Sequence, residues 1–127
     1  MKSIIYFESN TIFISSEDRE EKSYFVIYNL DSKNWTKYQI DKEEWSRNES
    51  PYIEKINFVN KDIGYACGWV NKSDFVIKSD VIYKTTDGGT SWNLQLNETT
   101  TPFTGLNDIE FSDVDNGIAV GFVISNV

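Results

Sequence analysis

The sequence predicts an all-β fold, and three observations lead to that prediction. A segment of 18 residues recurs in the chain at one constant spacing, which indicates a repeat architecture. Large and small residues alternate with a period of two inside each copy, as expected for strands that pack on both faces. No window long enough to form a helix shows helical periodicity. The chain also has a high aromatic content of 15%, which favours strands.

The repeat is visible when IEKINFVNKDIGYACGWV (53–70) is aligned with LNDIEFSDVDNGIAVGFV (106–123). The identities at an offset of 53 positions include six pairs: Ile56 with Ile109, Phe58 with Phe111, Asp62 with Asp115, Gly64 with Gly117, Ala66 with Ala119, and Gly68 with Gly121. Six ungapped identities at one offset indicate a duplicated structural unit.

A third, weaker copy is expected at the start of the chain. The residues YNLDSKNW (28–35) are similar to YKTTDGGTSW (83–92), with Asp31 in place of Asp87 and Trp35 in place of Trp92. This copy lacks both glycines of the longer segment.

The expected strands fall into three units along the chain. They lie near 3–7, 11–15, 23–29 and 35–40, then near 53–59, 64–70, 75–85 and 92–96, and finally near 107–111 and 117–124. Four-stranded antiparallel units of about 40 to 55 residues, joined by polar links, are typical blades of a β-propeller. We therefore predict one repeat domain over 1–127, a partial β-propeller of about two and a half blades near 1–45, 51–100 and 105–127.

The alternation also predicts which side chains share a face. Tyr65, Cys67 and Trp69 are expected on one face of their strand, and Ala66 and Gly68 on the other. A face of small residues allows a neighbouring sheet to approach closely, as blades do around a shared axis.

Charge and residue inventory exclude several classes of function. The net charge is −8 and the chain contains no His and one Cys. A nucleic-acid or anionic membrane surface requires basic residues, so we expect neither as a partner. Without His, the usual zinc, haem and general-base chemistry loses its groups, and we predict no metal, no cofactor and no catalytic residue. No signal-like or membrane-length apolar run is seen, so the expected location is cytoplasmic.

The segment TTDGGTSW (85–92) is expected to be a tight turn. Asp accepts hydrogen bonds from backbone N–H groups further along a turn, and consecutive glycines adopt positive φ without a clash. A Trp at the start of the next strand buries a large ring. A calcium or anion site at Asp87 is the alternative, although one carboxylate falls short of a calcium ligand set.

This segment resembles the Asp-box, or BNR repeat, with the pattern falling on Thr85, Asp87, Gly89, Ser91 and Trp92. The flanking strand pairs are similar to those of photosystem II stability/assembly factor-like propellers, and the resemblance covers about 53–123. It implies a structural hairpin turn on a blade rim, away from the binding surface. It also implies a non-catalytic protein-interaction or assembly scaffold with an unidentified protein partner.

Carbohydrate binding or hydrolysis is the alternative function, because sialidases also carry Asp-boxes. A sialidase-like site would need three converging arginines and a Tyr/Glu pair. This chain has only two arginines, Arg19 and Arg47. A pair of catalytic carboxylates is not excluded by counting, because the chain has 20 acidic residues. Cys67 is expected to be a small core residue rather than a nucleophile.

Two aromatic features each have a structural and a functional interpretation. Tyr24, Phe25, Tyr28 and Trp35 are favoured as blade core over a sugar-stacking platform. Trp45 lies in a polar link and is a candidate contact for a partner, with burial under the loop as the alternative.

Two and a half blades do not close a ring. The chain is therefore expected to be part of a longer propeller, to assemble with copies of itself, or to form a compact open array. An unpaired strand edge is expected near 117–124, where a strand from another chain could add.

Overall fold

The computed structural model describes residues 3–7, 11–17, 23–40, 50–71, 78–99 and 103–124. Every regular element within these ranges is a β-strand. The strands are β1 (Ser3–Phe7), β2 (Thr11–Glu17), β3 (Ser23–Asn29), β4 (Asn34–Gln39), β5 (Ser50–Phe58), β6 (Gly64–Asn71), β7 (Lys78–Thr85), β8 (Asn93–Thr99), β9 (Phe103–Phe111) and β10 (Gly117–Ile124). The prediction of an all-β fold is confirmed.

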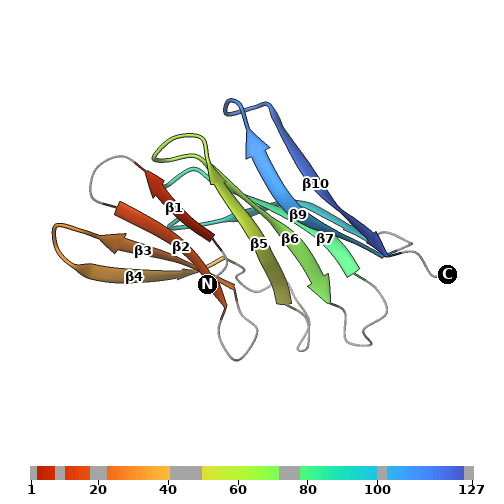
Figure 1. Ribbon diagram of the computed structural model, residues 1–127, viewed down its shortest axis with the longest axis horizontal. Helices are drawn as coiled ribbons and strands as arrows, with labels where there is room; N and C mark the ends of the chain where they lie inside the picture. Colours follow the sequence, from red (N-terminus) through yellow and green to blue (C-terminus); the bar gives the residue numbers. More distant parts are fainter. Residues whose placement is uncertain are drawn as a thin grey trace.

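The strands form three antiparallel sheets, each a meander in chain order. The first sheet is β1-β2-β3-β4, the second is β5-β6-β7-β8, and the third is the pair β10-β9. Figure 1 shows the three sheets spread side by side, from the first sheet on the left to the third sheet on the right. None of the described residues forms a helix long and apolar enough to cross a membrane.

Two strands begin earlier than the sequence predicted. β5 begins at Ser50 and includes Pro51, which lies opposite Val70 of β6. The sequence analysis expected this strand to begin near 53, after Pro51, and proline cannot donate a hydrogen bond to a strand ladder. β5 is an edge strand of its sheet, and an edge tolerates a missing N–H group. β9 likewise begins at Phe103 rather than near 107.

The repeat extends to the hydrogen bonds of the two hairpin turns β5–β6 and β9–β10. In each turn, one side-chain oxygen accepts the backbone N–H groups two and three residues further on, at distances of 2.8 to 2.9 Å. The acceptor is Asn60 for Asp62 (2.9 Å) and Ile63 (2.8 Å), and Asp113 for Asp115 (2.9 Å) and Asn116 (2.9 Å). These positions are again 53 residues apart, so the two turns are one structure built twice.

A β-bulge is repeated in the same way. The register shifts at Glu54 in the second sheet and at Asn107 in the third sheet. Next to each bulge a glycine lies against the paired strand: a Cβ atom would lie 1.8 Å from a backbone oxygen at Gly68 and 2.2 Å from one at Gly121. Both positions therefore require glycine, which explains why the repeat keeps it.

The core between the first and second sheets uses the small face of β6. Its buried residues are Ile40, Ile53, Ile56, Phe58, Ala66, Val70, Val81 and Tyr83, with Ile27, Trp92 and Leu94 packed against them. Ala66 is fully buried here, on the face where the sequence placed it.

The core between the second and third sheets uses the large face of β6. It buries Tyr65, Cys67 and Ile109, and Ala119 packs against them. The ring of Tyr65 stacks on Phe111 with centroids 3.6 Å apart. The predicted assignment of Tyr65 and Cys67 to one face and Ala66 to the other is thus confirmed.

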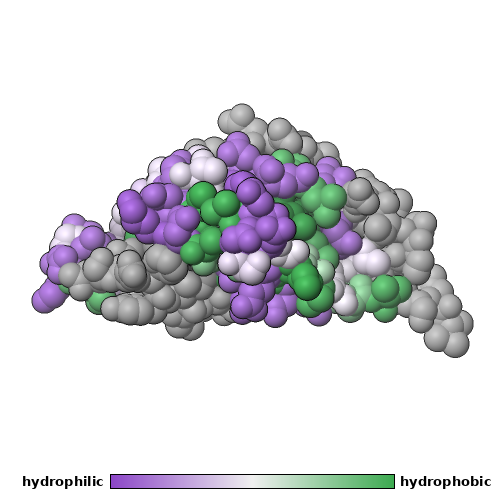
Figure 2. Space-filling view, turned by 90° about the horizontal axis from the view of Figure 1, so that it is seen from above, coloured by the Kyte–Doolittle hydropathy of each residue, from purple (hydrophilic) through white to green (hydrophobic). Residues whose placement is uncertain are grey.

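The sheets meet in a repeated order. The first strand of the second sheet, β5, contacts β1, β2 and β3, and the first strand of the third sheet, β9, contacts β5, β6 and β7. Each sheet therefore lays its first strand across the first three strands of the sheet before it. On the side of the molecule seen in Figure 2, apolar patches lie between polar residues.

Candidate functional site: the β7–β8 turn and the outer face of the third sheet

The segment that resembles an Asp-box connects β7 to β8. Thr85 is the last residue of β7 and is fully buried, and β8 begins at Asn93. Gly88 and Gly89 have φ values of 70° and 91°, a region that favours glycine. The two glycines thus let the chain reverse within a short connection.

Both carboxylate oxygens of Asp87 accept hydrogen bonds inside this turn. Thr85 Oγ1 and Ser91 N each donate to Oδ1 at 2.8 Å, and Ser91 Oγ donates to Oδ2 at 2.5 Å. Desolvation raises the pKa of Asp87, but the hydrogen bonds from Ser91 and Thr85 outweigh it and lower the pKa below its ordinary value. The carboxylate is held in its ionised form as an acceptor for its own loop.

Three further hydrogen bonds stabilise the turn, two within it and one to the neighbouring turn. Gly89 N donates to Thr85 Oγ1 at 2.9 Å, and Trp92 Nε1 donates to the Gly89 carbonyl at 3.0 Å. Gly88 N donates to the carbonyl of Asp62, in the β5–β6 turn, at 2.9 Å. The five residues of the predicted motif therefore lie together, and the Gly88 hydrogen bond joins their turn to the β5–β6 turn.

Trp92 links the turn to the core. Its ring packs edge-on against Phe58 with centroids 6.0 Å apart, and it lies against the core between the first and second sheets. The turn is thus attached to the interior through an aromatic contact as well as through backbone hydrogen bonds.

The corresponding turn of the first sheet is built differently. Here the acceptor is Asn29 Oδ1, which takes the N–H groups of Asp31 (3.0 Å) and Ser32 (2.9 Å), and Lys33 has a φ of 55°. An acceptor of this turn thus lies two residues before Asp31, the residue that aligns with Asp87.

The predicted role of Trp35 as blade core is also wrong. Trp35 is 59% exposed, and its ring lies on Tyr28 with centroids 4.4 Å apart. The side chains of Tyr24 and Phe25 lie outside the described part of the structure. Trp45, Arg19 and Arg47 likewise lie outside the described residues.

Cys67 is a core residue, as predicted. It is fully buried, and burial, together with the charges of Asp108 and Glu54, raises its pKa to about 12. A thiol with this pKa is not a nucleophile near neutral pH.

A second candidate site, which the sequence did not predict, is the outer face of the third sheet. We define the outer face as Asp108, Glu110, Ile118 and Val120. The cross-strand pairs are Asp108 with Val120 and Glu110 with Ile118. Opposite residues of an antiparallel pair lie on the same face of a sheet.

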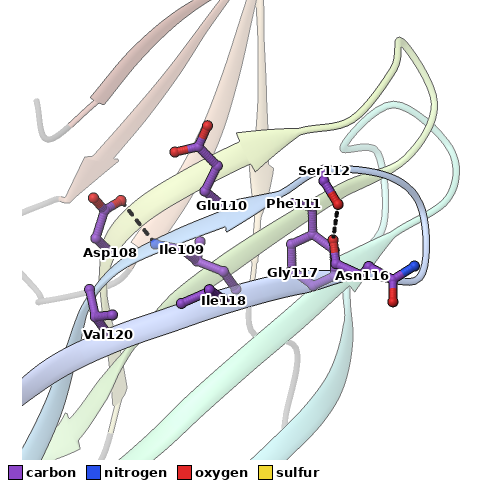
Figure 3. Close-up of a pocket in the computed structure, with 9 residues that line it drawn as sticks. All are labelled: Asp108, Ile109, Glu110, Phe111, Ser112, Asn116, Gly117, Ile118 and Val120. Atoms are coloured by element: carbon purple, nitrogen blue, oxygen red, sulfur yellow. Dashed lines mark hydrogen bonds between the residues drawn. The ribbon is translucent and has the colours of Figure 1, made fainter.

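The outer face is open and partly apolar. Ile118 is 71% exposed and Val120 is 54% exposed. These residues border a hollow of about 630 Å³ that also includes Phe111 and Asn116, and Figure 3 shows the two acidic side chains beside it. Asp108 additionally lies 3.8 Å from the Lys55 ammonium of the second sheet.

The alternation in GIAVGFVI contained the signal for this face, because it placed Ile118 and Val120 together. What the sequence could not show is that no described residue covers them.

Among the described residues, no group of three or more His, Cys, Asp and Glu side chains is arranged to hold a metal ion. Comparisons of the chain with protein-family models, with curated proteins and with solved structures found no match.

Proposed function

We propose that the chain is a non-catalytic, BNR-type β-propeller module that serves as a protein-interaction or assembly scaffold. The repeated order of sheet contacts supports the propeller geometry, because β5 and β9 each cross the first three strands of the preceding sheet. In a propeller, each blade contacts the preceding blade through equivalent strands.

One observation carries the non-catalytic assignment: the side chains that could react, Asp87 and Cys67, are engaged in the turn or buried in the core. Both oxygens of Asp87 accept hydrogen bonds within its own turn, and Cys67 is buried with a raised pKa. The chain has no His to serve as a general base. The motif residues thus support folding rather than substrate conversion.

The outer face supports a role in binding protein. Ile118 and Val120 stand 53 residues after Tyr65 and Cys67, which are buried under the third sheet. The same kind of face is therefore covered in one sheet and open in the next. Exposed apolar patches rimmed by polar residues are typical of protein contact surfaces.

A photo-crosslinking residue at Ile118 tests this proposal in cells that produce the chain. We expect one discrete adduct with another protein, and we expect excess unlabelled chain to compete it away. The same residue at Gln95, an exposed position on β8, is the matched control and should give no such adduct. Equal labelling from both positions would contradict a specific surface.

Carbohydrate recognition or hydrolysis is the second candidate, because Asp108 and Glu110 lie on one face beside the hollow. A glycan array combined with thermal shift measurements separates the two functions. The scaffold role predicts no sugar that raises the melting temperature. Stabilisation by a sugar that disappears when both residues are changed, Asp108→Asn with Glu110→Gln, would favour the carbohydrate function.

A further inference from the structure

The β9–β10 turn ends in the dipeptide Asn116–Gly117, the one Asn–Gly pair in the sequence. The second sheet has Ile63 at the position equivalent to Asn116, so its turn lacks this pair. The backbone nitrogen of the residue after an asparagine can attack the asparagine side chain. Glycine hinders this attack least, because it has no Cβ atom. The third sheet thus carries a chemically reactive dipeptide that its repeat equivalent does not.

The reaction in question is spontaneous deamidation. The Gly117 nitrogen forms a bond to Cγ of Asn116, and the bond from Cγ to Nδ2 breaks. The Nδ2 nitrogen leaves as ammonia and takes up the proton that the Gly117 nitrogen loses. Water then opens the resulting cyclic imide at either carbonyl, which gives aspartate or isoaspartate at position 116. Water is the only co-reactant.

The structure leaves both reacting groups of this turn accessible. Asn116 is exposed and lines the hollow beside the outer face, as Figure 3 shows. Ser112 N donates to the Asn116 carbonyl at 2.9 Å, whereas Phe111 N donates to Asn57 Oδ1 at 3.2 Å, away from β10. Because bonding alternates along an antiparallel ladder, Phe111 and Gly117 form a non-hydrogen-bonded pair. The Gly117 nitrogen is therefore not held by β9.

Asp113 holds the Asn116 side chain in an unreactive position. Nδ2 of Asn116 donates to both carboxylate oxygens of Asp113 at 2.9 Å, and the Asn116 backbone N–H donates to Oδ1 at the same distance. One carboxylate thus binds the carboxamide and the N–H of the same residue. The carboxamide is folded toward its own N–H and away from the Gly117 nitrogen. We call the two Nδ2 hydrogen bonds the Asp113 clamp, and they must break before the ring can close.

The dipeptide Asp87–Gly88 can form the same cyclic imide, but its contacts oppose the reaction. The hydrogen bonds to Asp87 lower its pKa and keep the carboxylate ionised, and an ionised carboxylate resists attack by a nitrogen. The Gly88 nitrogen donates to the Asp62 carbonyl at 2.9 Å. Asn116, whose carboxamide carries no charge, lacks this protection.

We infer that Asn116 is a site of spontaneous deamidation whose rate is set by the Asp113 clamp. The product adds a negative charge beside Asp113 and the hollow of the outer face, and it loses the two Nδ2 hydrogen bonds. Isoaspartate also adds one methylene to the backbone at the start of β10. The inference depends on the β9–β10 turn and not on the scaffold role, so either one can fail alone.

Ageing of the purified full chain at neutral pH, followed by peptide mapping with mass spectrometry, measures the rate at position 116. A synthetic peptide of residues 110–121 gives the rate without the fold. We expect the chain to react about fivefold or more slowly than the peptide, and Asp113→Asn to remove most of this difference, because its amide offers Nδ2 one acceptor oxygen fewer. The variant should keep the turn, since Asn60 forms the same backbone hydrogen bonds in the second sheet.

Asp115→Asn makes the same charge change in the same turn, keeps Asp113, and should leave the rate unchanged. Equal rates for Asp113→Asn and the unmodified chain would overturn the inference, as would equal effects of the two substitutions or a peptide that does not react at position 116. Amide exchange of Ser112, which donates to the Asn116 carbonyl, checks that the turn is kept. A faster reaction that appears only together with faster Ser112 exchange would assign the protection to the whole turn and not to the clamp.

Discussion

The second and third sheets are two copies of one unit in different surroundings. They share the Asx-type turn, the bulge and the glycine that contacts the paired strand, all at an offset of 53 residues. They differ in what covers the large face: Tyr65 and Cys67 lie under the third sheet, whereas Ile118 and Val120 are exposed. The internal geometry of a sheet thus follows from its own sequence, and its burial follows from its neighbours.

The largest difference between the two copies is expected in the stability lost on substitution to alanine, at Tyr65 and its repeat equivalent Ile118. Tyr65 stacks on Phe111, and its hydroxyl donates to the Val114 carbonyl at 2.6 Å. Tyr65→Ala should lower the free energy of unfolding by about 3–5 kcal/mol, because a large buried ring is lost. Ile118→Ala should change it by less than about 0.5 kcal/mol. Urea unfolding of both variants measures the contrast, and equal losses would mean that the two faces are equally buried.

The repeated glycines should give the next largest effect. A Cβ atom at Gly68 or Gly121 would overlap a backbone oxygen of the paired strand. Gly68→Ala should cost about 2–3 kcal/mol, because Gly68 lies in a strand enclosed by two sheets, where relaxation is difficult. Gly121→Ala should cost less, because the third sheet has one free face. Thermal unfolding of the pair tests this order, and a larger loss at Gly121 would reverse our view of which sheet is more constrained.

The Asp87 turn is present in the second sheet, and no described counterpart occurs in the third. Asp87→Ala removes the acceptor of three hydrogen bonds and should lower the free energy of unfolding by about 1–2 kcal/mol. Because the turn is fixed to Asp62, the loss should also increase amide exchange at the β5–β6 turn. Unchanged exchange there would show that the two turns act independently. Thr86→Ala, at an exposed position of the same turn, is the control.

The smallest expected effect is on the pH dependence of stability. It arises at Asp113, whose repeat equivalent in the second sheet is Asn60. Hydrogen bonds from the Asp115 backbone and the Asn116 side chain lower the pKa of Asp113 below its ordinary value of 3.8. Its contribution is therefore present above that value and is lost as pH falls through the lower folded-state pKa. Asp113→Asn should lower stability slightly near neutral pH, because this contribution is lost, and the two chains should converge in stability below about pH 4. Acid titrations of both chains that superimpose would contradict this assignment.

Much of the fold could be predicted from the sequence because strands carry their own pattern. The period of two located β6 and β10 and assigned Tyr65 and Ala66 to opposite faces. Asp87 was predicted correctly as the centre of a turn, since Asp and Gly residues act on their own backbone. Trp35 was assigned to the core in error, because whether an apolar face is covered depends on distant strands. For the same reason, the sequence did not reveal the outer face around Ile118.

The most direct test of the account compares thiols at repeat-equivalent positions in one molecule. Val120→Cys places a thiol 53 residues after Cys67, so a single variant carries one thiol on the covered face and one on the open face. Dilute protein is treated with a thiol reagent, and the two labelling rates are measured. We expect one thiol to react at the rate of an exposed cysteine and Cys67 to react at least about a thousandfold more slowly, because it is buried and its pKa is about 12. Two thiols with similar rates would show that the second and third sheets are not stacked as described.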